Sequence, residues 1–237
     1  MIPCRECGKD SGWSQELIDQ PLFGGNLDVA VCDRCCEEYH QQQKEEDKPA
    51  TFDLEPIEKM IPPLYLETNY DLLPNDAKSI WAHIKYWTPE IQKGIYLLGS
   101  SRTGKTRTLC LLLKKLHDDG VAFKLFLAGQ FHAALAEAKR SRFFTSWRDE
   151  MVQIPVLAID DLFAEKLTET TQAGLFELIE QRMANKKPTL ITTQVRRGDA
   201  VKQFADPRRG EALLNRLKET CDLYLTNADH VQTKMKV

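Results

Sequence analysis

The sequence predicts a doubly wound α/β domain built on a parallel sheet and preceded by a small cysteine-rich module. From Gly94 onward, short apolar runs alternate with helical patterns. A glycine-containing loop, GSSRTGKT (99–106), joins the first apolar run to the first helical pattern. Five of the seven cysteines lie within the first 36 residues, before the alternating region begins. Alternation of strands and helices is typical of a parallel sheet with helices on both faces.

Composition and charge narrow the class of protein. The chain has 237 residues, a hydrophobic fraction of 42% and a net charge of −3, so it has room for one full domain and a small module. It carries no overall basic field, and any contact with nucleic acid would need a local patch. The first residues, MIPCRECGKD, lack the apolar core of a signal peptide, and no apolar run approaches the roughly 20 residues that span a bilayer. We therefore expect a cytoplasmic protein without a membrane partner, whose cysteines stay reduced.

The amino-terminal cysteines form two C-x₂-C pairs separated by 24 residues. Two such pairs can place four thiolates around a tetrahedral Zn²⁺ ion, and the stretch 22–31 could form a hairpin between them. The predicted ligands are Cys4, Cys7, Cys32 and Cys35, with Cys36 as a substitute; plain reduced cysteines are the alternative. A module of 1–40 has too little core to fold without metal, so we expect a structural zinc ribbon that docks on protein or DNA.

The next stretch separates the module from the larger domain. Residues 40–50, HQQQKEEDKPA, are almost entirely polar, and we assign a linker to 41–56 and the larger domain to 57–237. Four prolines in 52–74 predict an extended strap rather than a helix. Apolar residues recur at helical spacing in 75–87 and predict a helix there.

The alternating region contains five strand candidates and five helix candidates. The apolar runs are short and bounded by turn residues, as strands buried on both faces are. The predicted strands are 95–99, 122–128, 155–160, 188–193 and 221–226. The predicted helices are at about 104–118, 130–139, 143–151, 168–186 and 207–219.

The loop between the first strand and helix has the spacing G-x-x-x-x-G-K-[ST]. Gly99 and Gly104 permit dihedrals that turn backbone N–H groups toward a phosphate, and the start of the helix adds its positive dipole end. Lys105 could reach the β- and γ-phosphates, and Thr106 offers a hydroxyl to Mg²⁺. The predicted nucleotide-binding residues are Gly99, Ser100, Ser101, Arg102, Thr103, Gly104, Lys105 and Thr106, together with Asp160. The loop therefore predicts binding of a nucleoside triphosphate; an ordinary strand–helix loop is the alternative.

A second motif, VLAIDDLF (156–163), is an apolar strand that ends in two carboxylates. The carboxyl end of a parallel strand is where ligands of such sheets bind. Asp160 is placed to hold the magnesium ion with Thr106, and Asp161 to orient or deprotonate the attacking water. Solvated turn aspartates are the alternative.

These motifs and three further stretches resemble the helicase-loader branch of the AAA+ ATPases, the DnaC/DnaI/IstB group. The stretches are IPPLY (61–65), LFELIEQRMANKKPTLITTQ (175–194) and GEALLNRLKETCDLYLT (210–226), and the likeness covers roughly residues 57 to 230. It implies a P-loop NTPase core of the AAA+ class, with ATP as ligand and Mg²⁺-dependent hydrolysis. Few residues follow 226, which agrees with the absence of a helical lid in that branch.

The resemblance also implies roles for two residues outside the nucleotide motifs. Gln194 corresponds to the first sensor, with Thr193 as the neighbouring candidate; an ordinary polar residue at a strand end is the alternative. Arg216 corresponds to the arginine that AAA+ subunits project into a neighbouring site, which implies a homo-oligomer when ATP is bound. A surface ion pair of Arg216 with Glu211 or Glu219 is the alternative.

The sequence departs from the family pattern at three positions. Arg102 stands where the family usually has glycine, Asp161 is one methylene shorter than the glutamate that many members use, and Phe163 replaces a common glycine. These departures predict nucleotide binding with slow turnover.

A local basic patch lies between the second and third strands. Cations interleaved with aromatic residues suit single-stranded DNA, whose phosphates pair with charge and whose bases stack. The patch comprises Lys139, Arg140, Arg142 and Arg148 around Phe143, Phe144 and Trp147. A solvated helix face with its aromatic residues in the core is the alternative.

Taken together, these features predict an ATP-dependent DNA replication accessory protein, most like a replicative helicase loader, with a helicase or transposase as its protein partner. Three alternatives remain open: an IstB-like transposase helper, a small-molecule P-loop kinase, and a nucleotide-binding scaffold with little turnover. The kinase is disfavoured because the sequence contains no basic lid over an acceptor site.

Overall fold

The computed structural model describes residues 2–4, 7–10, 32, 34–35, 52–141 and 144–226. The chain divides into two compact units, Met1–Thr51 and Phe52–Val237. The expected hairpin at 22–31 lies outside the described residues, as do Cys36 and most of the expected linker. The boundaries 1–40, 41–56 and 57–237 therefore stay predictions.

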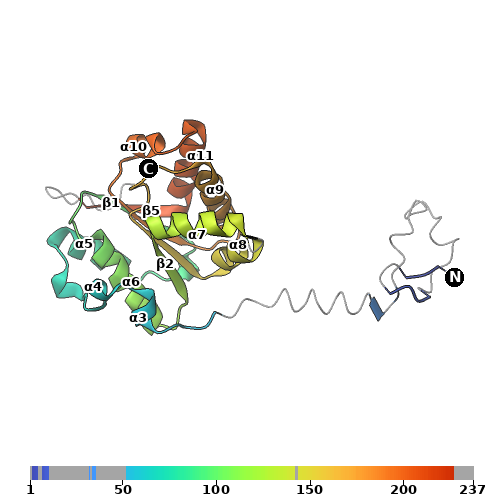
Figure 1. Cartoon of the computed structure of the whole chain (residues 1–237). Helices are drawn as coiled ribbons and strands as arrows, with labels where there is room; N and C mark the ends of the chain where they lie inside the picture. The colour runs from blue at the N-terminus through green and yellow to red at the C-terminus, as the bar shows by residue number, and fades with distance from the viewer. Residues whose placement is uncertain are drawn as a thin grey trace. The chain divides into compact units, whose positions relative to one another are not determined.

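The second unit contains a five-stranded sheet in which every neighbouring pair of strands is parallel. The order across the sheet is β2-β3-β4-β1-β5. The strands are β1 (Gly94–Gly99), β2 (Phe123–Leu127), β3 (Val156–Asp160), β4 (Thr189–Thr193) and β5 (Cys221–Thr226). All five occur where the sequence predicted them, so the predicted parallel α/β fold is confirmed (Figure 1).

Helices cover both faces of this sheet (Figure 1). The helices that the sequence predicted are all present in the structure. They are α5 (Asn75–Ile84), α6 (Lys105–Asp118), α7 (Ala128–Arg140), α8 (Phe144–Gln153), α9 (Glu169–Ala184) and α11 (Pro207–Thr220). A short helix, α10 (Arg197–Lys202), was not predicted, because six residues are too few to show helical periodicity. No helix in the described part of the chain is long and apolar enough to cross a membrane.

The prediction that the strap at 52–74 is extended is wrong. The strap contains three short helical turns, α3 (Ile57–Met60), α4 (Pro63–Leu66) and the 3₁₀ turn η2 (Tyr70–Leu72). Pro56 precedes the first turn and Pro63 is the first residue of the second. Proline has the backbone φ of a helix and lacks only an N–H that a first turn leaves unpaired. Here the prolines begin helical turns instead of preventing them.

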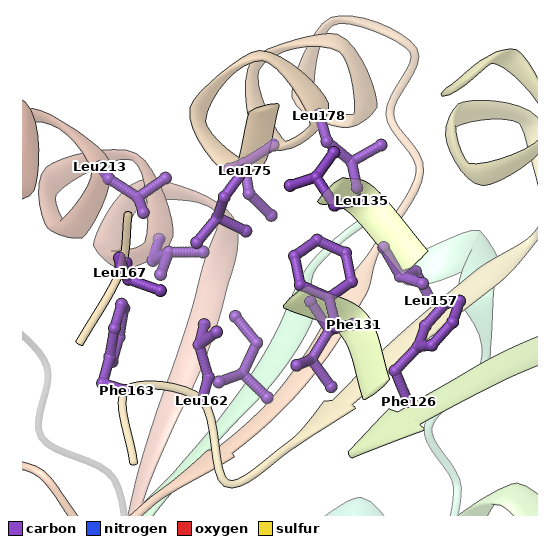
Figure 2. Packing of buried hydrophobic residues seen from close by; sticks show 14 of the residues in the cluster. Phe126, Phe131, Leu135, Leu157, Leu162, Phe163, Leu167, Leu175, Leu178 and Leu213 are labelled. Carbon is purple, nitrogen blue, oxygen red and sulfur yellow. The ribbon is translucent and has the colours of Figure 1, made fainter. Parts of the chain in front are cut away.

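The core lies in two clusters, one on each face of the sheet, and β3 contributes to both. Val156 and Ala158 contact the cluster that includes α6, whereas Leu157 and Ile159 contact the cluster that includes α7, α9 and α11. Figure 2 shows the second cluster, in which Phe131 and Leu135 of α7 meet Leu175 and Leu178 of α9. Because side chains alternate between the faces of a strand, a strand covered on both faces is mostly apolar and shows no alternation with polar residues. This packing explains why the predicted strands showed no polar alternation.

Candidate nucleotide-binding site

The carboxyl ends of β1, β3 and β4 meet at one edge of the sheet, and the predicted loop lies there. β1 ends at Gly99 and α6 begins at Lys105, so residues 100–104 form the connection. A Cβ at Gly99 would lie 2.0 Å from the backbone carbonyl oxygen of Thr226, so this position admits no side chain unless β5 moves. Gly104 has φ +88°, a conformation that glycine adopts without steric cost. Each glycine of the motif is thus required by a specific local feature.

A cavity of about 410 Å³ opens beside this loop. Its lining combines the loop and the start of α6 with residues after β3 and at the end of β4. The strap supplies the remaining wall through Leu64, Tyr65, Leu72 and Pro74. The other lining residues are Ser101, Arg102, Gly104, Lys105, Thr106, Arg107, Asp161, Thr192 and Gln194.

Lys105 is folded back onto the loop. Its Nζ donates hydrogen bonds to the carbonyl oxygens of Gly99 at 2.9 Å and Ser100 at 2.8 Å. The residue is only 7% exposed, and desolvation lowers the pKa of its ammonium group against the opposing attraction of Asp161 and Asp160. The positive charge is therefore held at the mouth of the loop by dipoles that a phosphate could replace.

Asp160 and Thr106 are in direct contact. The Thr106 hydroxyl lies 3.0 Å from both carboxylate oxygens of Asp160. Burial raises the pKa of the Asp160 carboxyl, whereas hydrogen bonds from Thr192 and Thr106 stabilise its charged form. The structure thus brings together the two residues that the sequence assigned to magnesium.

Asp161 and Gln194 also face each other across the cavity edge. Gln194 Nε2 lies 3.5 Å from Asp161 Oδ2, at the outer limit of a hydrogen bond. Asp161 has φ +58°, an uncommon conformation for a residue other than glycine. Thr193, the other sensor candidate, is fully buried and donates its hydroxyl hydrogen bond to the Leu162 carbonyl at 2.6 Å. Of the two candidates, Gln194 is the one that lines the cavity.

Thr192 is a residue that the sequence analysis missed. Its hydroxyl donates to Asp160 Oδ1 at 2.6 Å and accepts the backbone N–H of Asp161 at 2.8 Å. One buried hydroxyl therefore contacts both acidic residues of β3. β4 ends in two consecutive threonines, Thr192 and Thr193, and only the pleat of the strand decides which of their hydroxyls reaches Asp160 of β3.

Arg216 is not among the described residues that line the cavity. Its Nε donates to Glu180 Oε1, which joins α11 to α9, and this ion pair raises the pKa of the guanidinium. The partner is thus neither Glu211, which pairs with Arg197, nor Glu219. The side chain of Arg216 is 37% exposed and remains accessible from solvent.

The four predicted cysteine ligands lie together in the first unit. The Sγ atoms of Cys4, Cys7, Cys32 and Cys35 all lie within 4.8 Å of one another, and those of Cys7 and Cys32 are 3.7 Å apart. A zinc–sulfur bond of about 2.3 Å requires a separation of about 3.8 Å between sulfurs at the corners of a tetrahedron. The cluster fits a zinc module without large rearrangement.

The basic patch is described only in part, because Arg142 and Phe143 lie outside the described residues. Phe144 and Trp147 are partly buried against the core. Arg148 donates to Glu177 at 3.0 Å and to Asp149 at 2.9 Å. In the described part of the patch, the aromatic residues thus pack against the core, and one cation of the patch, Arg148, is already paired with carboxylates.

Comparisons with known proteins agree with this geometry. No curated protein matches the chain. Among solved structures, the crystal structure of the DnaC helicase loader is similar, with 25% identity over 69% of this chain and 99% of that chain and a TM-score of 0.58. DnaI is similar at 19% identity over 70% and 94%, with a TM-score of 0.59. AMPPCP-bound DnaA from Aquifex aeolicus shares the fold at 19% identity over 75% and 52%, with a TM-score of 0.55.

A family model described as IstB-like ATP binding protein matches residues 79–237, about two thirds of the chain. The matched region contains the loop at 99–106, both acidic residues of β3 and the end of β4. This family match agrees with the AAA+ type of P-loop fold that the chain shares with the DnaC structure. The chain belongs to the family of IstB-like ATP-binding proteins.

Proposed function

We propose that this protein is a Mg²⁺-dependent ATPase that helps to load a replicative helicase onto DNA. The observation that carries the proposal is the cavity at the carboxyl edge of the sheet, which Lys105 and Thr106 line and where the Thr106 hydroxyl contacts the Asp160 carboxylate. The similarity to the DnaC helicase loader, which extends over 99% of that chain, supports the choice of process.

The oxygen donors at this edge fit a magnesium ion. Thr106 and Asp160 supply a hydroxyl and a carboxylate, the hard ligands that Mg²⁺ prefers. When bound, the ion would supply positive charge against the phosphate oxygens. Lys105 would exchange the two loop carbonyls for phosphate oxygens, and the strap residues Leu64, Tyr65 and Leu72 would cover the base.

The pair formed by Asp161 and Gln194 is placed to act on water. A carboxylate accepts hydrogen bonds and an amide both donates and accepts them, so together they could hold one water molecule in a single orientation. Arg216 would complete the site of a neighbouring subunit, since it lies away from the cavity of its own chain. The active form would then be a homo-oligomer assembled by ATP.

ATP hydrolysis with and without single-stranded DNA tests this proposal, with Lys105→Ala as the matched inactive variant. We expect DNA-stimulated turnover by the wild type and a loss of at least about 100-fold in the variant. Binding of ATP without turnover would favour the scaffold instead. Phosphate transfer to a metabolite would favour a small-molecule kinase and contradict the loader.

The match to the IstB-like family favours a second candidate, a helper ATPase of a transposase. Affinity purification from the native host, with ATP and then with ADP, separates the two candidates. ATP-dependent recovery of a replicative helicase supports the loader, whereas recovery of a transposase supports the helper. The Lys105→Ala variant serves as the control for nucleotide dependence.

We also propose that the four amino-terminal cysteines bind one structural Zn²⁺ ion. With four thiolates the coordination shell is full, which suits a structural site rather than a catalytic one. Metal analysis of the purified chain should give about one zinc per chain, and Cys4→Ser/Cys32→Ser should remove it. Cys110→Ala, which changes a buried thiol of α6, should retain the metal.

Single-stranded DNA is a further proposed partner through the patch at 139–148. Salt-dependent binding that is lost in Arg140→Ala/Arg142→Ala would support it. Binding unchanged in that variant would assign the DNA contact to another surface.

A further inference from the structure

Arg102 occupies a backbone conformation that favours glycine. Its φ is +65°, in the left-handed region, within the loop that faces the cavity. The same loop uses glycine at Gly104, where φ is +88°. A side chain in this region crowds the following carbonyl oxygen, so the conformation is disfavoured for arginine. Strained residues of this kind cluster at functional sites, where the strain is retained for a purpose other than stability.

Three cationic side chains line the cavity: Arg102, Lys105 and Arg107. Lys105 is buried against the loop carbonyls. The Arg107 guanidinium lies 3.3 Å from the Thr68 hydroxyl and over the Tyr65 ring, 5.9 Å from its centroid.

Arg102 differs from Lys105 and Arg107. It is exposed, and within the part of the chain that the structure describes no carboxylate forms an ion pair with it. It therefore presents an uncompensated guanidinium beside the loop. A nucleoside triphosphate brings about four negative charges to such a loop. A guanidinium has the planar fork that pairs with two phosphate oxygens at once.

We infer that the Arg102 side chain is a direct ligand of the polyphosphate tail, in addition to the loop N–H groups and Lys105. This inference rests on the nucleotide binding proposed above and adds a residue whose side chain, rather than its backbone, would hold the phosphates. It accounts for the presence of arginine at a position where glycine would relieve the strain.

Three substitutions separate the side chain from the backbone. Arg102→Gly removes the strain and the charge, Arg102→Gln removes the charge but keeps a side chain at positive φ, and Arg102→Lys keeps both the side chain and the charge. If Arg102 were only tolerated, glycine would stabilise the fold and leave ATP binding equal or tighter. If Arg102 binds phosphate, glycine would stabilise the fold and weaken ATP binding.

Calorimetric titration with ATP and magnesium, together with thermal unfolding of each variant, tests the inference. We expect Arg102→Gly and Arg102→Gln to weaken ATP binding about tenfold or more. Arg102→Lys keeps the charge but loses the planar fork, so its ATP affinity should lie between that of Arg102→Gln and that of the wild type. The Tm of Arg102→Gly should rise by about 2–4 °C. ATP affinities of Arg102→Gln and Arg102→Gly equal to that of the wild type would overturn the inference alone. Absence of ATP binding by the wild-type chain would overturn the proposed function and this inference with it.

Discussion

Thr192 offers the sharpest test of how the two acidic residues of β3 are held. Replacing it by valine keeps the shape and removes two hydrogen bonds, one donated to Asp160 at 2.6 Å and one accepted from the Asp161 N–H at 2.8 Å. A hydrogen bond to a charged group contributes about 1.5–3 kcal/mol, and a buried N–H left unpaired costs about 1–3 kcal/mol. Thr106 still contacts Asp160 in the variant. We therefore expect Thr192→Val to lower the free energy of unfolding by about 3 kcal/mol.

The substitution should also lower the rate of catalysis. A displacement of about 1 Å in a catalytic group can cost about 100-fold in rate, so the kcat for ATP hydrolysis should fall by about that factor. Thr193→Val is the matched control, because it also removes two hydrogen bonds of a buried hydroxyl in β4, to the Leu162 carbonyl and from the Val195 N–H. We expect the control to unfold at a similarly lowered temperature and to keep a kcat within about threefold of the wild type.

Steady-state ATPase measurements at several magnesium concentrations, combined with scanning calorimetry, check both parts. Thr192→Ser retains the hydroxyl and should recover most of the kcat and the magnesium requirement of the wild type. Equal losses of kcat in Thr192→Val and Thr193→Val would show that the hydroxyl of Thr192 has only a structural role, and the reasoning would be refuted.

Three further predictions follow from single contacts. Gly99→Ala should strongly destabilise the fold, because the new Cβ would lie 2.0 Å from the backbone carbonyl oxygen of Thr226, and thermal unfolding followed by circular dichroism would show a lowered Tm or a lost cooperative transition. Arg182→Met should lower the free energy of unfolding by about 3–5 kcal/mol in urea titrations, since this guanidinium is 1% exposed and binds the carbonyl oxygens at the end of α8. Arg216→Ala should lose ATPase activity and regain part of it when mixed with Lys105→Ala, because each variant would supply what the other lacks; a mixture as inactive as its components would exclude action between subunits.

The strap shows where local reasoning from the sequence failed. Four prolines in 52–74 suggested extended backbone, yet all four precede or begin a helix or helical turn. Proline sets φ without deciding ψ, so the same residue fits an extended segment and a first helical turn. In the helical conformation of the strap, Ile61 is 2% exposed and packs in the core cluster that includes α6.

The order of strands and helices was determined by the sequence itself, because apolar runs, helical periodicity and the spacing of Gly99, Gly104 and Lys105 are local patterns. Three features were decided only by the tertiary structure: the strand order, the contact of Thr192 rather than Thr193 with Asp160, and the ion pair of Arg216 with Glu180. These contacts join residues 32 and 36 positions apart. They depend on which strands are adjacent in the sheet and on which side of a strand or helix each side chain lies. Neither can be predicted from a local sequence pattern.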